Sequence, residues 1–239
     1  MPAAPRLLVI DSATETLAVA ACGPAGEATW SGPGGAAASA QLLPAAMAML
    51  AQAGLQGGAL DAIAFGAGPG AFTGLRTACA AVQGLAFGLG CPVLPLDDLA
   101  VWAEDSSWHD GAPLWVAIDA RMEEVYAAAY RRQADAGWAI VRSPALFTLE
   151  ALAARWTAEP PQRMAGNALA AFGARLPDGG AQRHDALVDR PAALLRLARA
   201  AWLRGEAVDP ALALPVYLRD KVALTSAERA ERGAQRALT

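Results

Sequence analysis

The sequence predicts an α/β protein built from two similar halves. Short apolar runs typical of strands alternate with longer runs typical of helices along the chain. One strand-like run, 62–65, leads directly into a glycine-rich segment, and a helix-like run over 75–89 follows it. The strand and hairpin pattern near residue 10 then recurs near residue 118. These three observations favour two tandem lobes, each with a mixed sheet and flanking helices.

The individual elements follow from the apolar pattern and from the turn residues between the runs. In the first half, strands are expected at about 6–11, 16–22, 27–31, 62–66 and 92–96, with helices at about 36–54, 73–89 and 97–104. In the second half, strands are expected near 114–119, 124–131, 137–142 and 163–166, with helices near 148–156, 168–175 and 191–204. Each half therefore begins with three strands, a helix, a strand and a helix.

The opening hairpins of the two halves can be aligned. Ile10-Asp11-x-x-x-Glu15 matches Ile118-Asp119-x-x-x-Glu123, and an alternating strand follows each. Together with the repeated order of elements, this match indicates an internal duplication. Two halves of this kind resemble the actin/Hsp70/sugar-kinase superfamily, in which the two Asp-bearing hairpins face one another across a nucleotide cleft. We expect a first lobe over 1–104 that is completed by elements near 191–221, a second, degenerate lobe over 112–215, a tail over 222–239, and a domain boundary in the polar stretch 104–113.

The glycine-rich segment Gly66-Ala-Gly-Pro-Gly-Ala-Phe-Thr-Gly-Leu-Arg76 is the most informative part of the chain. Its glycines allow unusual backbone angles and let another group approach closely. It matches neither common phosphate motif, because Gly74 is followed by Leu75 rather than Lys, and Thr73 stands where a dinucleotide loop needs glycine. A tight turn between strand and helix and a ligand or partner loop both remain open.

Asp11 and Asp119 end apolar strands, where ligand sites of α/β folds lie, and a carboxylate there could hold a hydrated Mg²⁺. The hairpin after Asp11 contains no glycine, and Glu15 would repel a phosphate. A turn-capping role for Asp11 is therefore a full alternative. The candidate loop site, with weak nucleotide binding at most, comprises Asp11, Ser12, Gly68, Gly70, Thr73 and Asp119.

Composition argues against several classes of function. The 239 residues are 55% hydrophobic and carry a formal net charge of −4, which is typical of a globular protein and unlike a chain that grips nucleic acid alone. The two histidines and three cysteines form no metal-binding or disulfide motif, so no metal site and no catalytic residue is predicted. The sequence also predicts no signal peptide and no membrane span, so we expect a cytosolic protein.

The helices expected at 36–54 and 74–89 are too apolar for ordinary surface helices. Another element of the same chain could cover their second side, but two neighbouring helices of this kind favour an interface with a partner. The candidate partner-binding residues are Leu42, Leu43, Ala46, Met47, Leu50, Leu75, Ala78, Val82 and Leu85.

Several segments together resemble the TsaB (YeaZ) family of threonylcarbamoyladenosine biosynthesis. They are 8–15, 39–44, the glycine-rich segment 66–76, 84–86, 119–126, 166–168 and Pro215-Val216-Tyr217-Leu218-Arg219. The resemblance implies a non-catalytic scaffold that pairs with the catalytic subunit TsaD, helps recruit the ATPase TsaE, forms a homodimer when alone, and meets tRNA only within the complex.

The chain also departs from its relatives in ways that bear on metal chemistry. TsaD has the same fold and carries a His-x-x-x-His motif on the helix that matches 36–54, where this chain has only Ala and Gln around Ser39 to Leu43. Many TsaB members keep one histidine at the position of Ala38. The alternative is an ATP-handling enzyme, or a metallopeptidase-like (glycoprotease) protein of the same fold.

Overall fold

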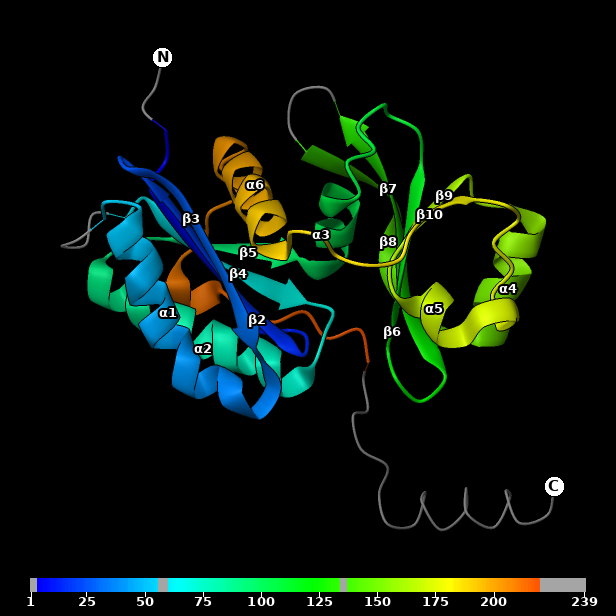
Figure 1. Cartoon of the computed structure of the whole chain (residues 1–239), viewed down its shortest axis with the longest axis horizontal. Helices are drawn as coiled ribbons and strands as arrows, with labels where there is room; N and C mark the ends of the chain where they lie inside the picture. Colours follow the sequence, from blue (N-terminus) through cyan, green and yellow to red (C-terminus); the bar gives the residue numbers. More distant parts are fainter. Residues whose placement is uncertain (1–3, 56–59, 134–136, 220–239) are drawn as a thin grey trace, which may run out of the picture.

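The computed structural model describes residues 4–55, 60–133 and 137–219, and it contains two five-stranded mixed sheets with helices packed on their faces (Figure 1). The first sheet has the order β3-β2-β1-β4-β5. Its strands are β1 (Leu7–Asp11), β2 (Thr16–Gly23), β3 (Gly26–Pro33), β4 (Ala62–Gly68) and β5 (Val93–Asp97). The second sheet has the order β10-β9-β6-β7-β8. Its strands are β6 (Leu114–Asp119), β7 (Glu124–Gln133), β8 (Gly137–Thr148), β9 (Arg163–Ala165) and β10 (Gln182–His184).

The two sheets have the same topology, which confirms the two-lobed actin-like fold predicted from the sequence. In each sheet the first three strands form an antiparallel meander, and the fourth and fifth strands add in parallel beside the first. The sequence did not reveal β10, because its three residues, Gln182-Arg183-His184, are polar and show no apolar alternation. The strand predicted over 137–142 also ends six residues before β8 does.

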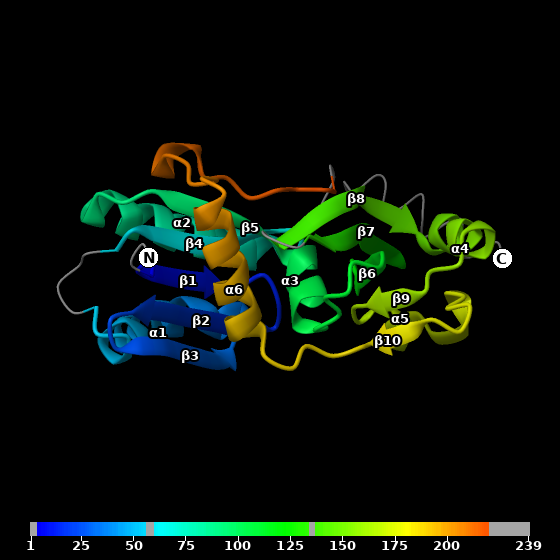
Figure 2. The same cartoon turned by 90° about the horizontal axis from the view of Figure 1, so that it is seen from above.

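Alternating side chains bury both faces of the first sheet. In β1, Leu8 and Ile10 face one core and Leu7 and Val9 face another. Helices α1 (Ala38–Gln52, after the short helix η1, Gly35–Ala37) and α2 (Phe72–Leu89) cover the first of these faces, and α6 (Arg190–Leu203) covers the opposite face (Figures 1 and 2). In the second lobe, α4 (Leu149–Ala158) and α5 (Ala168–Phe172, followed by η2, Gly173–Arg175) cover the outer face of the sheet.

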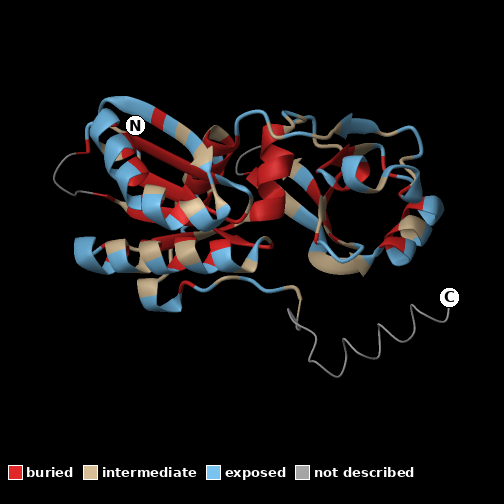
Figure 3. Cartoon of the chain, turned by 60° about the horizontal axis from the view of Figure 1, so that its bottom comes forward, coloured by how far each residue is buried: buried red, intermediate tan, exposed pale blue. Residues whose placement is uncertain are grey.

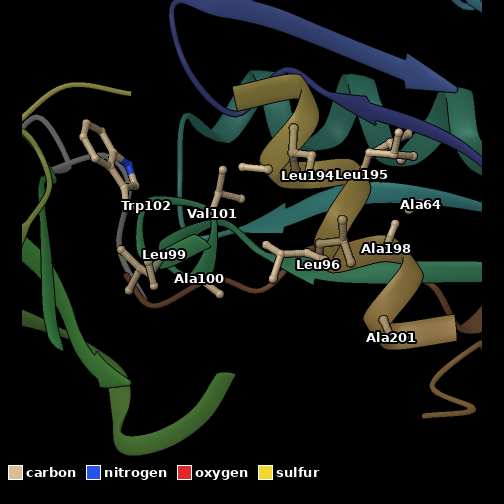
Figure 4. Packing of buried hydrophobic residues seen from close by; sticks show 14 of the residues in the cluster. Ala64, Leu96, Leu99, Ala100, Val101, Trp102, Leu194, Leu195, Ala198 and Ala201 are labelled. Atoms are coloured by element: carbon tan, nitrogen blue, oxygen red, sulfur yellow. The ribbon is translucent and has the colours of Figure 1, made fainter. Parts of the chain in front are cut away.

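Helix α3 (Asp98–Asp105) joins the two lobes, and all eight of its residues are buried. One continuous core combines side chains of α3 and α6 with residues of both sheets (Figure 4). The buried carboxylate of Glu104 accepts hydrogen bonds from Trp138 (2.9 Å) and from the guanidinium groups of Arg132 and Arg196. The polar stretch expected to separate the lobes thus begins inside a buried helix, and the exposed connector starts only after Asp105.

The C-terminal part of the described chain, residues 208–219, returns along the first lobe, and we call it the strap. Val208 pairs with Val93 at the start of β5, and the short helix η3 (Pro210–Leu212) follows. The backbone N–H of Val216 donates to the carbonyl of Ala67 at 2.7 Å. The predicted tail, 222–239, lies outside the described residues. Among the residues that the structure describes, no helix is long and apolar enough to cross a membrane.

Candidate functional site

A cleft of about 870 Å³ lies between the lobes, and the two predicted hairpins line it from opposite sides. Glu15 of the first hairpin and Arg121 of the second form an ion pair at 2.8 Å. Asp119 lines this cleft, whereas Asp11 is fully buried and does not reach it. The hairpins therefore face one another as expected, but their two aspartates do not share one open site.

Asp11 is held by groups of its own chain. One carboxylate oxygen accepts the backbone N–H of Ala13 at 2.8 Å, which caps the turn after β1. The other oxygen forms an ion pair with the guanidinium of Arg190, at the start of α6. Arg190 also donates to the carbonyl of Thr16 at 2.9 Å and to the hydroxyl of Thr14. A side-chain cation of the same chain thus already pairs with the Asp11 carboxylate.

A second buried carboxyl, Asp98, lies next to Asp11 and was missed at the sequence level. One of its oxygens accepts the N–H of Gly68 at 2.7 Å, and the other has no hydrogen-bond partner among the described residues. Burial, and then the neighbouring Asp11 carboxylate, hold the pKa of Asp98 well above its usual range, although Arg190 opposes them. A protonated Asp98 could donate its hydrogen toward Asp11, which would satisfy the remaining oxygen.

The glycines of the 66–76 segment accommodate groups of the protein itself. A Cβ atom on Gly74 would lie 1.8 Å from the carbonyl oxygen of Ser12, and one on Gly70 would lie 2.7 Å from Ala13. At Gly68, whose φ is +117°, a Cβ would lie 2.6 Å from the carbonyl oxygen of Val216 in the strap. Of the two interpretations left open by the sequence, these contacts support a tightly packed turn between strand and helix.

The structure brings most of the predicted loop site together. Ser12 donates its hydroxyl to the carbonyl of Gly74 at 2.7 Å, so Asp11, Ser12, Gly68 and Gly70 lie around the ends of β1 and β4. Thr73 is exposed in the first turn of α2. Asp119 belongs to the other lobe. Nucleotide binding at these residues stays a prediction.

The turn between β6 and β7 has an unusual backbone on the second side of the cleft. Arg121, Met122 and Glu123 all have positive φ angles, between 57° and 64°, which L-residues rarely adopt. Asp119 accepts the N–H of Arg121 at 2.7 Å. From the strap, Arg219 donates to the carbonyl of Ala120 at 2.9 Å and pairs with Glu124 at 2.7 Å. Both hairpin aspartates therefore have arginine or backbone partners, and no group of three or more metal-ligating side chains occurs among the described residues.

The burial of α1 and α2 corrects the predicted partner surface. Five of the nine residues lie in the protein's own core rather than on its surface, because they form the helix faces that cover the first sheet: Leu42, Ala46, Leu75, Ala78 and Val82. Leu50 and Leu85 are half-buried. The most exposed large apolar side chains of these helices are Leu43 and Met47 on α1, at 49% and 63%, and Phe87 on α2, which is 62% exposed and was not predicted. Both helices carry exposed as well as buried positions along their length (Figure 3).

Arg190 and Phe87 illustrate what the sequence could and could not reveal. Arg190 lies 179 positions from Asp11, and no local pattern links the two. Phe87 lies in the same helix-like run but off the predicted stripe, and the apolar character of the whole run did not single it out. The consecutive acids Asp97 and Asp98, at the end of a predicted strand, were a usable signal, because ligand and polar sites gather at such strand ends.

Comparisons with known proteins agree with the fold and with the sequence motifs. The family model of TsaD, tRNA N6-adenosine threonylcarbamoyltransferase, matches residues 35–170. The tRNA threonylcarbamoyladenosine biosynthesis protein TsaB of Escherichia coli is 31% identical over 237 residues, which cover 91% of this chain and 96% of that protein. TsaB of Haemophilus influenzae is 45% identical over 87 residues, which cover 36% of this chain and 37% of that protein.

Two solved structures from Pseudomonas aeruginosa are similar over 90% of this chain and 100% of theirs, at 38% identity. One, described as similar to peptidase YEAZ, superposes with a TM-score of 0.80, and the other, described as YeaZ, with a TM-score of 0.78. The chain belongs to the TsaB (YeaZ) family of tRNA threonylcarbamoyladenosine biosynthesis proteins.

Proposed function

We propose that this chain is a non-catalytic scaffold subunit required for threonylcarbamoyl transfer to the tRNA adenosine next to the anticodon. The observation that carries the proposal is the buried ion pair between Asp11 and Arg190. If this lobe held a metal–nucleotide complex, we would expect the Asp11 carboxylate to be open to the cleft, and here it is buried and paired with a guanidinium. The glycine-rich segment is likewise filled by Ser12, Ala13 and Val216. Both features are consistent with a protein whose fold presents a binding surface rather than a catalytic centre.

The surface formed by α1 and α2 is our proposed contact with a TsaD-like catalytic subunit. Helix α1 contains no charged residue, and Arg76 is the one charged residue of α2. A partner that covers this face of the first lobe would therefore have few charged groups to strip of water. The outward side chains of this face include Leu43, Met47 and Phe87. Large exposed apolar groups in one region are typical of protein interfaces. When alone, the chain would form a homodimer through the same surface.

The remaining parts of the proposal follow from this pairing. The assembled pair would help to recruit a TsaE-like ATPase, and tRNA would bind only through the complex, since the chain itself is acidic overall. Such a role belongs in the cytoplasm.

A charge on the outward face of α1 tests the proposed contact. Met47→Glu should weaken binding of the purified TsaD-like subunit by at least tenfold in isothermal titration calorimetry, because an unpaired charge is costly in an apolar contact. Ile140→Glu is the matched control, since Ile140 is 57% exposed on β8 of the other lobe. Equal affinities for both variants and the unaltered protein would reject the contact.

The second candidate function is an ATP-handling enzyme or a metallopeptidase-like protein, and the open cleft with Asp119 on its wall favours it. The isolated chain should show neither ATP turnover nor peptidase activity, and elemental analysis should find no stoichiometric zinc or iron. ATP hydrolysis at enzyme-like rates by the purified chain, lost in Asp119→Asn, would replace the scaffold proposal with this one.

A further inference from the structure

The last residues of the strap line the cleft and run from the first lobe to the second (Figure 2). On the side of the first lobe, the N–H of Val216 donates to the carbonyl of Ala67 in β4 at 2.7 Å. Three positions later, the guanidinium of Arg219 donates to the carbonyl of Ala120 at 2.9 Å and pairs with Glu124 at 2.7 Å. These two residues flank the β6–β7 turn of the second lobe. A short stretch of backbone therefore links strand ends that belong to different sheets.

The strap is fastened to the first lobe at several points before it reaches the second. The ring of Tyr217 contacts that of Phe72 with their centroids 5.2 Å apart, and its hydroxyl accepts the Nε–H of Arg76 at 3.0 Å. The guanidinium of Arg76 also lies 3.9 Å from the centre of the Phe72 ring, within cation–π distance. Gln83 on α2 donates to the carbonyl of Ala213 at 3.0 Å. The strap thus extends the first lobe, and Arg219 is where it holds the second.

Arg219 contacts a turn whose backbone is strained. Arg121, Met122 and Glu123 have φ angles of 64°, 57° and 62°, a left-handed conformation that L-residues adopt only when their surroundings hold them in it. Part of that support comes from the strap. Besides its bond to the carbonyl of Ala120, the guanidinium of Arg219 lies 3.1 Å from the sulfur of Met122. Because the turn depends on an outside contact, it should relax when Arg219 lets go.

The other connections between the lobes differ in strength. Helix α3 is buried, and its core continues into both sheets, so it forms a firm base about which the lobes can turn. The ion pair between Glu15 and Arg121 crosses the cleft, but its side chains are 87% and 73% exposed, and such pairs contribute little. The side chains of Arg219 and Glu124 are 13% and 29% exposed, so water and salt screen their attraction less.

We propose that Arg219 is a clasp that sets the opening of the cleft, and that its release lets the lobes part about α3 and the β6–β7 turn relax. Both ends of the clasp lie within this chain, so it does not depend on the proposed function. In this arrangement the end of the strap, rather than a bound ligand, determines how far apart the two hairpins stand.

Double electron–electron resonance on the full chain tests the clasp. Spin labels are placed at Ala80→Cys on α2 and Ala154→Cys on α4, both exposed positions, whereas the three native cysteines are buried. An excess of unlabelled protein restricts the signal to distances within one chain. Arg219→Ala should shift the distance distribution to longer values and broaden it. Glu124→Gln, which removes the ion pair alone, should cause a smaller shift in the same direction and serves if Arg219→Ala fails to fold.

Tyr217→Phe is the matched control, because it removes a hydrogen bond that stays within the first lobe. Its distance distribution should equal that of the otherwise unaltered labelled protein. An unchanged distribution in Arg219→Ala would overturn the clasp, even if this variant unfolds at a lower temperature. An equal shift in Tyr217→Phe would also overturn it, because the effect would then come from a loosened strap and not from the contact with the second lobe.

Hydrogen exchange followed by mass spectrometry tests the link between the clasp and the turn. The N–H of Ala120 is bonded to the carbonyl of Glu124 at 2.9 Å, and the N–H of Glu124 to the carbonyl of Arg121 at 3.1 Å. In Arg219→Ala, exchange at these two amides should be faster by roughly tenfold or more, because the turn opens more often. Arg142→Ala, which breaks an exposed ion pair elsewhere in the second lobe, should leave it unchanged. Longer distances without faster exchange would show that the turn does not depend on the clasp.

Discussion

Arg190, in the first turn of α6, forms an ion pair with Asp11 at the end of β1, and 7% and 0% of their side chains are exposed. The pair fastens a C-terminal helix to the first strand of the chain. It also gives the buried Asp11 carboxylate a cationic partner from its own chain.

Removing Arg190 should destabilise the fold strongly. Arg190→Ala leaves the Asp11 carboxylate buried without its partner, and breaking a buried pair in this way costs about 3–5 kcal/mol. The free energy of unfolding in urea should fall by about that amount. Arg142→Ala is the control, since its pair with Glu159 is exposed and should contribute at most about 1 kcal/mol. Equal losses in the two variants would show that burial does not matter here.

Asp98 should make stability depend on pH. Its folded-state pKa is raised above 3.8, so the folded protein binds a proton that the unfolded chain has released. The stability that this proton contributes is complete below about 3.8 and is lost as the pH rises toward the folded-state pKa. Asp98→Asn keeps the shape and cannot ionise. Its urea midpoint should therefore decline less than that of the unaltered protein between pH 5 and 8. Parallel curves for the two proteins would contradict a raised pKa at Asp98.

Two glycines of α2 should respond in opposite directions to the same substitution. Gly74→Ala places a Cβ 1.8 Å from the Ser12 carbonyl oxygen, so the helix and the β1–β2 hairpin must separate and stability should fall by at least about 2 kcal/mol. Gly84→Ala meets open space and should raise stability by up to about 1 kcal/mol through helix propensity. Thermal unfolding of the two variants compares them directly. A loss of stability in Gly84→Ala would mean that this glycine has an internal role.

The sequence predicted the fold well because its strands and helices carry strong local patterns. The matching hairpins at Asp11 and Asp119 indicated the duplication, and the second sheet repeats the topology of the first. β10 escaped prediction because a three-residue polar strand is defined only by its pairing with β9. Helical periodicity located the apolar stripe of α1 but could not tell which side met the sheet. Leu42 and Met47 therefore stood in one predicted surface, although one is buried and the other exposed.

The arrangement of the candidate site could not be predicted from local sequence patterns, because it depends on contacts between distant parts of the chain. Asp11 alone is compatible with a metal ligand or a turn cap. Only the packing of α6 against β1 brings Arg190 to it and decides between these roles. The contact of the strap with the glycine-rich segment could not be predicted for the same reason, because Val216 packs against Gly68 from a distant position in the sequence.

The most direct test of the scaffold account is mass spectrometry of nucleosides from tRNA in a depletion strain that carries each variant. Depletion alone should remove threonylcarbamoyladenosine, and Met47→Glu should fail to restore it. Asp11→Asn combined with Arg190→Met keeps the buried site filled and free of an unpaired charge. This double variant should restore the modification fully, because these residues have no catalytic role in a scaffold. Normal modification without the protein, or loss of modification in the stably folded Asp11→Asn/Arg190→Met variant, would contradict the account.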